Sequence, residues 1–335
     1  MLLKTVGAAP KGGRQSSLPP YGKNNNMRLA LLCAPALQPT CAWMSERVSE
    51  LGHSVDHQSL EARDVAAAAS TGHALADRWA AHRPDLVLAL GWEAGLAAQI
   101  GARDCAAPVL LRLTRVVNGQ DADGARLERA VVRGSSLVVV PSVGAAQRLV
   151  DRGVPRGTLR VLPEAVDRRR YADRGASSGG PDRRVGVVAP EDGRDQDVSR
   201  RLAGMPGCQA VRVSLAQPDE QLADTLRSID VLVVEDDTDE EVAMSLRAMS
   251  CGVPVIAPDS GVMADIVADN VTGLLVSRGS LTDALRSLLS DPMRREAMGL
   301  AAVDRVRARF DVSVVGAMLE RTLHEAVGSR TAIAS

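Results

Sequence analysis

The stretch SLRAMSCGVPVIAP, from Ser245 to Pro258, decides the fold of this chain. Leu246 and Met249 are three residues apart, a spacing that is typical of the buried face of a helix. The Cys251-Gly252 pair then predicts the end of that helix, because glycine readily adopts the backbone conformation that follows a helix. The remaining residues, VPVIAP, predict a short buried strand. A helix followed closely by a buried strand is the repeating unit of a parallel sheet.

The same alternation extends in both directions from this stretch. Downstream, Gly273 to Val276 predicts another short strand, and the pattern from residue 281 onward is helical. Upstream, apolar runs alternate with amphipathic segments back to Arg28, including an alanine-rich helix that we expect to be interrupted near Gly72. A polar segment at 172–183, with three glycines and a proline, breaks the series. We therefore predict an α/β protein with two Rossmann-like domains, each built on a parallel sheet.

The predicted domain boundaries follow these breaks. Residues 1–26, rich in Gly, Pro, Ser and Asn, are expected to be a disordered leader. The first domain covers 27–171, and the linker at 172–183 leads to a second domain that covers 184–310. A final helix at 311–328 has apolar residues on one face.

Composition excludes several classes of protein. The 335 residues include 40 Lys and Arg and 41 Asp and Glu, a balance that argues against a nucleic-acid-binding protein. No run of 18 or more apolar residues occurs, so the sequence predicts no membrane span. The five cysteines contain no C-x-x-C pair, which argues against a structural zinc site and favours a reduced, cytoplasmic chain. High Ala, Arg, Val and Asp content indicates a bacterial source.

Taken together, the motifs resemble those of the GT-B glycosyltransferases, specifically the retaining, nucleotide-sugar-dependent enzymes of family four. The resemblance runs from about Met27 to the end of the chain and is closest over 230–310. The segments that carry it are LVVVPS (Leu137 to Ser142), RVLPEAVD (Arg160 to Asp167), SLRAMSCGVPVIAP, NVTGLLV (Asn270 to Val276) and the helical stretch Leu285 to Phe310.

The resemblance implies a fold and a reaction. Two Rossmann-like domains would face each other across a cleft, with the final helix at 311–328 returning to the first domain. The second domain would bind a nucleotide-sugar donor, and the first would bind a small-molecule or glycan acceptor. The sugar would be transferred with retention, with no metal or other cofactor, and the chain could work beside a partner glycosyltransferase.

Carried onto this chain, the family's charged donor contacts are largely replaced. The family's Arg and Lys fall at Val187 and Asp192, and its two glutamates fall at Asp239 and Arg247. By resemblance, the expected catalytic residues are Asp239, Glu240 and Arg247, and the expected donor-binding residues are Gly193, Arg194, Gly261 and Asp265.

Two residues are expected on the acceptor side. Trp92 and Glu93 directly follow an apolar strand and Gly91, which places them at a carboxyl end of the sheet facing the cleft. Packing of Trp92 in the core is the alternative.

The acidic run EDDTDEE, from Glu235 to Glu241, has two interpretations. Thr238 and Glu241 have the spacing of a capping box at the start of a helix. Alternatively, the run lies where the donor should bind, and its acids would hold sugar hydroxyls or a cation. Arg247, on the same helix, would either contact phosphate or pair with nearby acids such as Asp239.

Two other functions stay open. The loss of the family charges at Val187, Asp192 and Arg247 favours a catalytically degenerate relative that acts as a binding or partner subunit. A sugar-nucleotide epimerase on the same fold is the third hypothesis, because fold alone does not determine function.

Overall fold

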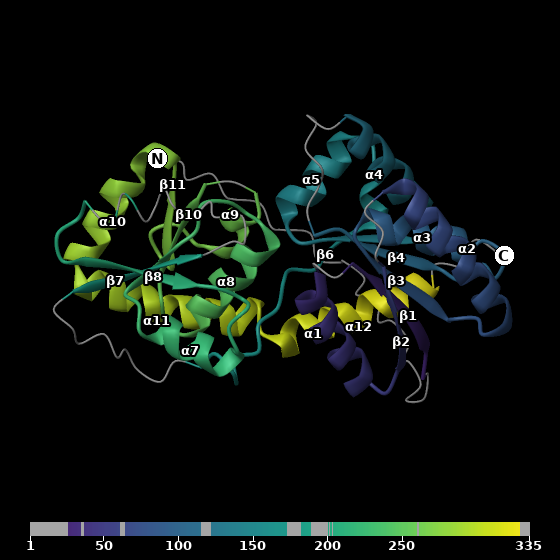
Figure 1. Cartoon of the computed structure of the whole chain (residues 1–335), viewed down its shortest axis with the longest axis horizontal. Helices are drawn as coiled ribbons and strands as arrows, with labels where there is room; N and C mark the ends of the chain where they lie inside the picture. Colours follow the sequence, from purple (N-terminus) through teal and green to yellow (C-terminus); the bar gives the residue numbers. More distant parts are fainter. Residues whose placement is uncertain are drawn as a thin grey trace, which may run out of the picture.

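The structure, a computed structural model, describes residues 26–34, 37–60, 64–114, 122–172, 182–188, 200, 202, 204–259 and 261–328. These residues form two lobes, each built on one sheet (Figure 1). The first sheet has the strand order β2-β1-β3-β4-β5-β6 and the second has the order β11-β10-β9-β7-β8. All strand pairings within both sheets are parallel. The prediction of two Rossmann-like α/β domains is confirmed.

The first lobe alternates strands and helices along the chain. Its strands are β1 (Arg28–Cys33), β2 (Ser54–Ser59), β3 (Leu86–Leu90), β4 (Val109–Arg112), β5 (Leu137–Val140) and β6 (Leu159–Val161). Its helices are α1 (Gln38–Glu50), α2 (Val65–Ala81), α3 (Trp92–Ala102), α4 (Ala122–Gly134) and α5 (Val143–Asp151). Along β1, Ala30 and Leu32 pack with residues of α2 and α3, whereas Leu29 and Leu31 pack on the opposite face. Both faces of the sheet are therefore buried, which explains why its strands are apolar throughout.

Two details of this lobe differ from the predicted pattern. Helix α2 continues through Gly72, where an added Cβ would lie 2.7 Å from the Cβ of Ile100 on α3. Glycine at this position lets the two helices pack closely and does not interrupt α2. Strand β2, with the polar sequence SVDHQS, has no counterpart among the predicted strands because it lies at the edge of the sheet and buries few side chains.

The second lobe contains the stretch that decides the fold. Its strands are β7 (Arg183–Val188), β8 (Cys208–Val213), β9 (Val231–Val233), β10 (Val255–Pro258) and β11 (Gly273–Val276). Its helices are α7 (Asp219–Arg227), α8 (Asp239–Ser250), α9 (Met263–Ile266), α10 (Leu281–Ser290) and α11 (Pro292–Arg309). The SLRAMSCGVPVIAP stretch forms the end of α8, a turn in which Gly252 has a φ of 79°, and β10. The helix-to-strand prediction for this stretch is confirmed.

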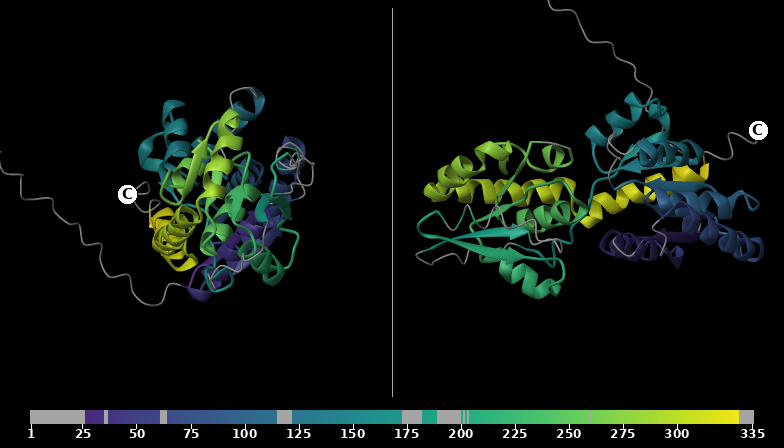
Figure 2. Two further views of the ribbon diagram at one scale, coloured as in Figure 1. Left: turned by 90° about the vertical axis from the view of Figure 1, so that its left-hand side faces the viewer. Right: turned by 45° about the horizontal axis from the view of Figure 1, so that its top comes forward.

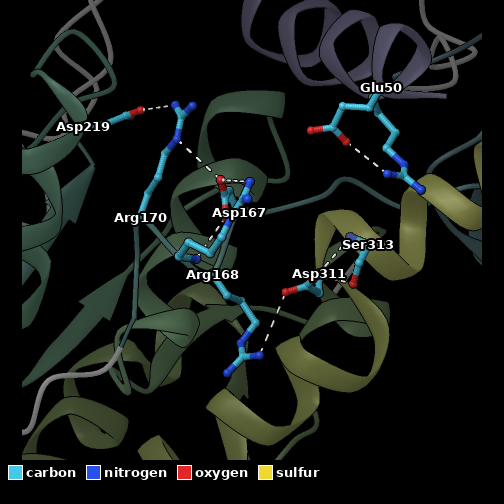
Figure 3. Close-up of polar contacts among 9 residues, drawn as sticks. Glu50, Asp167, Arg168, Arg170, Asp219, Asp311 and Ser313 are labelled. Carbon is cyan, nitrogen blue, oxygen red and sulfur yellow. Dashed lines mark hydrogen bonds and ion pairs between the residues drawn. The ribbon is translucent and has the colours of Figure 1, made fainter. Parts of the chain in front are cut away.

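The chain passes between the lobes twice, and the two crossings lie side by side. The Val166 N–H donates to the Phe310 carbonyl at 2.9 Å, and the Val312 N–H donates to the Val166 carbonyl at 3.2 Å. Around them, Arg170 pairs with Asp219 at 2.8 Å on the second lobe (Figure 3). These contacts connect the crossing segments to both lobes.

After the second crossing, helix α12 (Val312–Gly328) extends along the first lobe, in line with α11 (Figure 2). Val315, Leu319 and Leu323 of α12 join the same buried cluster as Leu29 and Leu31 of β1. The predicted return of the final helix to the first domain is confirmed.

Parts of the predicted organisation lie outside the described residues. These include all of the expected leader except Asn26, and the expected linker except for Ala172, Asp182 and Arg183. None of the helices in the described part of the chain has the length and apolar composition needed to cross a membrane.

Candidate active site

The carboxyl ends of both sheets face each other across a narrow cleft between the lobes. The Val143 N–H, at the start of α5, donates to the Asp265 carboxylate on the second lobe at 2.8 Å. Close by is a gap of about 10 Å³, room for about one water molecule. The described residues that line the gap are Arg112, Thr114, Pro141, Glu164, Asp239, Val242 and Val262. The lobes are therefore closed on each other in this structure.

The capping interpretation of the acidic run is confirmed for Glu241. Thr238 is the N-cap residue of α8, and its hydroxyl accepts the Glu241 N–H at 3.3 Å. The Glu241 carboxylate accepts the backbone N–H groups of Glu235 at 2.9 Å and Asp236 at 3.1 Å. Glu241 therefore holds the loop between β9 and α8 in shape.

A second acid in this loop, Asp237, contacts the backbone beside Gly261, where we expected the donor to bind. Its carboxylate accepts the Val262 N–H at 3.4 Å. Gly261 has a φ of 53°, and a Cβ added there would collide with Asp237 Oδ2. Glycine is thus needed at 261 both for its conformation and for the close approach of Asp237. A carboxylate of the chain itself thus contacts the backbone beside Gly261, an expected donor-binding residue.

Asp265, expected to bind the donor, bridges the two lobes through its bond to Val143. It lies on the short helix α9, and Arg305 of α11 contacts the backbone of that helix. The Arg305 guanidinium donates to the Ile266 carbonyl at 2.6 Å and to the Asp265 carbonyl at 2.8 Å. Arg305 therefore fixes the position of the Asp265 backbone in the cleft.

The three expected catalytic residues share helix α8 but not one location. Asp239 and Glu240 are in its first turn, and Asp239 lines the gap between the lobes. Arg247 lies eight residues after Asp239, a rise of about 12 Å along a helix. Its guanidinium is 5.3 Å from the ring centroid of Tyr171, beside the first crossing segment. The structure brings Asp239 to the cleft and places Arg247 against Tyr171, so its expected phosphate contact stays a prediction.

Tyr171 connects Arg247 to a further acid. The Tyr171 hydroxyl donates to the Asp219 carboxylate at 2.6 Å. Burial raises the pKa of Tyr171, and the positive charge of Arg247 opposes that rise. Burial also raises the pKa of Asp219, but hydrogen bonds from Tyr171 and Arg170 outweigh it and hold this pKa below its usual value. The cluster therefore stabilises an ionised carboxylate beside the first crossing segment.

Two expected donor-binding residues, Gly193 and Arg194, lie outside the described residues, as does Asp192. Val187 is described, and it is 2% exposed near the carboxyl end of β7. Valine thus fills the core at the position to which the resemblance assigns the family's arginine.

The expected acceptor-side residues lie at the carboxyl end of β3. Trp92 and Glu93 open helix α3 after Gly91, whose φ is 89°. Trp92 is partly buried and packs against the core cluster of the first lobe. This agrees with the core-packing alternative, and an acceptor contact by either residue stays a prediction.

Sequence reasoning did not single out the buried ion pair on the first-lobe side of the cleft. Arg112 Nη2 donates to Glu164 Oε2 at 2.9 Å, and the two side chains are 1% and 13% exposed. Trp43 Nε1 donates to Glu164 Oε1 at 2.7 Å. Two signals were available: Arg112 ends the apolar strand VLLR, and Glu164 is an acid within RVLPEAVD, one of the segments that carry the resemblance.

A larger cavity of about 250 Å³ lies next to the gap. Side chains from both lobes and from α12 line it. Its described lining residues are Pro141, Val143, Val161, Pro163, Glu164, Val262, Asp265, Ile266, Ala308, Arg309, Phe310, Val314 and Met318. Glu164 and Val262 line both spaces, so the cavity and the gap adjoin.

A metal site needs several ligating side chains close together. Within the described residues, no three His, Cys, Asp or Glu side chains are grouped so that they could hold a metal ion. All five cysteines are free.

Two family models match the chain, one for each lobe. Residues 28–165 match the model described as glycosyl transferase 4-like domain, and residues 185–305 match the model described as glycosyl transferases group 1.

Curated relatives match about half of the chain. The D-inositol 3-phosphate glycosyltransferase of Kribbella flavida is 33% identical over 192 residues, which cover 55% of this chain and 43% of that protein. The GDP-mannose-dependent monoacylated alpha-(1-6)-phosphatidylinositol monomannoside mannosyltransferase of Corynebacterium glutamicum is 28% identical over 193 residues, covering 55% and 47%. The matched region thus spans less than half the length of these relatives.

Solved structures share the fold over most of the chain. Sucrose-phosphate synthase from Thermosynechococcus elongatus has a TM-score of 0.79 at 16% identity, covering 91% of this chain and 100% of that one. HepE of Anabaena, in complex with UDP and glucose, has a TM-score of 0.72 at 16% identity, covering 89% and 100%. At this level of identity, the likeness concerns the fold.

Proposed function

The chain belongs to the GT-B glycosyltransferases of the family-four type, and we propose that it transfers a sugar from a nucleotide-sugar donor to an acceptor hydroxyl with retention. One observation carries the proposal. Asp239 of the second lobe and the Arg112–Glu164 pair of the first line the same gap, at the carboxyl ends of both sheets. Ligands of parallel α/β sheets bind at that edge.

The reaction requires one bond to form and one to break. The acceptor oxygen bonds to the anomeric carbon of the sugar, and the bond from that carbon to the diphosphate oxygen breaks. The nucleoside diphosphate leaves with the electron pair, and the hydroxyl proton passes to the departing phosphate oxygen. With retention, the acceptor approaches on the face from which the diphosphate leaves. The protein's main task is to position the two substrates and to stabilise the phosphate charge.

The donor enters only if the closed lobes separate. The gap beside Asp239 has a volume of about 10 Å³, far below that of a nucleotide-sugar. The two crossing segments, at 166–172 and 310–312, are the natural hinge because they connect the lobes. Opening there would break the Val143–Asp265 hydrogen bond and admit the donor.

In the open form, different parts of the second lobe would bind the sugar and the diphosphate of the donor. Asp239 would accept hydrogen bonds from the hydroxyls of the donor sugar. The N–H groups at Gly261 and Val262 would hold the diphosphate once Asp237 moves aside. The name of the Corynebacterium relative, with GDP-mannose as donor, supports a nucleotide-linked sugar. No metal is part of the proposal, so we expect transfer to continue at the same rate in EDTA.

Donor binding and turnover test the proposal directly. Titration calorimetry with UDP-glucose and GDP-mannose should give saturable heat with at least one donor. Asp239→Asn should lower kcat about 100-fold or more, because it weakens contacts made as the sugar loses its leaving group. Asp283→Asn, the same change at an 83% exposed site on α10, should leave kcat unchanged. Absence of binding for every donor at millimolar concentration would refute the proposal.

A second candidate function is a catalytically degenerate partner subunit. Two observations favour it. Val187 is buried in the core at the family's arginine position, and the Asp237 carboxylate already accepts the Val262 N–H. In that case the wild type would bind no nucleotide, and the variant Val187→Arg/Asp192→Lys/Arg247→Glu would gain binding.

A further inference from the structure

The cavity beside the cleft has walls suited to an apolar ligand. Its described lining is aliphatic and aromatic except for Glu164, Asp265 and Arg309. Its volume is about 250 Å³. Because an apolar cavity of about 150 Å³ holds one benzene molecule, this one has room for about ten non-hydrogen atoms.

Glu164 stands at the junction between this cavity and the gap, and it is fixed in place. Its Oε1 accepts Trp43 Nε1 at 2.7 Å. Its Oε2 accepts Arg112 Nη2 at 2.9 Å and the Thr40 hydroxyl at 3.3 Å. A carboxylate has about four acceptor positions, so one remains for a further donor.

Arg112 is held by hydrogen bonds to the first lobe. Its Nη1 donates to the Leu162 carbonyl at 3.0 Å, and its Nη2 donates to Glu164. Its Nε is buried without a hydrogen-bond partner in the part of the chain that the structure describes. A buried unmet donor is costly in a folded protein, and this nitrogen exposes almost no surface to the gap. The open acceptor position of Glu164 suits a hydroxyl group, which donates one hydrogen bond.

The charged residues that line the two spaces restrict the net charge of the ligand. Glu164 already neutralises Arg112. The other charged residues in the described lining of the two spaces are Asp239, Asp265 and Arg309. Three carboxylates and two guanidinium groups leave no surplus positive charge for an anion, so a neutral ligand is favoured.

We infer that the cavity and the Arg112–Glu164 pair together bind the acceptor, and that the acceptor is a small neutral alcohol with an apolar body. In the closed form without donor, the body would fill the cavity and the hydroxyl would lie in the gap between Glu164 and Asp239. The assignment of this ligand as a glycosyl acceptor rests on the proposed function. Its hydroxyl oxygen is the atom that bonds to the anomeric carbon. The Arg112–Glu164 pair would act by orienting this hydroxyl.

Binding of 2-phenylethanol to the full chain without donor tests the ligand class. Titration calorimetry should give saturable binding to the wild type. Val314→Phe fills the cavity from α12 and should weaken binding by about tenfold or more. Ala317→Phe places the same side chain on the exposed face of that helix and should bind like the wild type. Circular dichroism and Tm would show that both variants are folded. Equal binding by Val314→Phe and wild type, or no binding by the wild type, would overturn the inference.

Transfer measurements separate this inference from the proposed function. With GDP-mannose or UDP-glucose as donor, kcat/KM should be about tenfold or more higher for 2-phenylethanol than for inositol 3-phosphate. A higher value for inositol 3-phosphate would overturn the inference and leave the glycosyltransferase function intact. Cavity-dependent binding of 2-phenylethanol without binding of any nucleotide-sugar would support the ligand class and refute the transfer reaction.

Discussion

Neutralising Asp237 should strengthen nucleotide binding. In the closed structure its carboxylate accepts the Val262 N–H and lies against Gly261. A donor diphosphate at the same N–H groups would have to displace this carboxylate and then remain close to it. Asp237→Asn keeps the shape and the acceptor oxygen of the side chain but removes its charge.

The size of the effect follows from the separation of the charges. Two like charges about 5 Å apart repel by about 3 kcal/mol at an effective dielectric constant of 20. Asp237 is only partly buried, so solvent and salt reduce the repulsion to about 1–1.5 kcal/mol. We therefore expect the Kd for UDP or GDP to fall about tenfold in Asp237→Asn.

Titration calorimetry at low ionic strength is the assay, with Asp283→Asn as the control for net charge. That control removes one negative charge at a remote site that is 83% exposed, and its Kd should match the wild type. The gain in Asp237→Asn should shrink as salt is added, because screening weakens the repulsion. An unchanged or larger Kd in Asp237→Asn, or an equal gain in Asp283→Asn, would refute the assignment of phosphate to the Gly261 backbone.

Three further predictions concern stability. Arg112→Met should lower the free energy of unfolding by about 3–5 kcal/mol because Glu164 would keep a buried, unpaired charge. Urea denaturation should show a lower midpoint. Adding Glu164→Gln to this variant should recover part of the lost stability. Gly299→Ala should destabilise the protein by about 1–3 kcal/mol, since an added Cβ would collide with a backbone carbonyl in the turn before β10; an unchanged Tm would contradict this close packing. Despite the opposing effect of burial, hydrogen bonds including that from Tyr171 hold the pKa of Asp219 below its ordinary value of about 4. The stability that they confer should therefore be fully present above that value and be lost as the pH falls from it through the lowered pKa. Asp219→Asn should flatten the acid side of the stability curve, and a wild-type slope in this variant would show that the cluster does not contribute.

Much of the site could not be predicted because its contacts join distant parts of the chain. Arg112 and Glu164 are 52 residues apart, and Val143 and Asp265 are 122 residues apart. Which residues meet at these points depends on the strand order in each sheet and on how far the lobes close. The contact of Asp237 with Gly261 likewise depends on how closely two loops at neighbouring strand ends approach each other.

The sequence by itself determined the local and periodic features of this protein. Alternating apolar runs and amphipathic segments predicted the parallel sheets, and Thr238 with Glu241 predicted a helix cap, since these signals act over a few residues. The tertiary structure alone decided which charges face the cleft. It placed Arg247 against Tyr171, and it buried the Arg112–Glu164 pair beside an apolar cavity. The physical reason is that burial and pairing of a charge depend on neighbours brought together by folding, which residue spacing does not record.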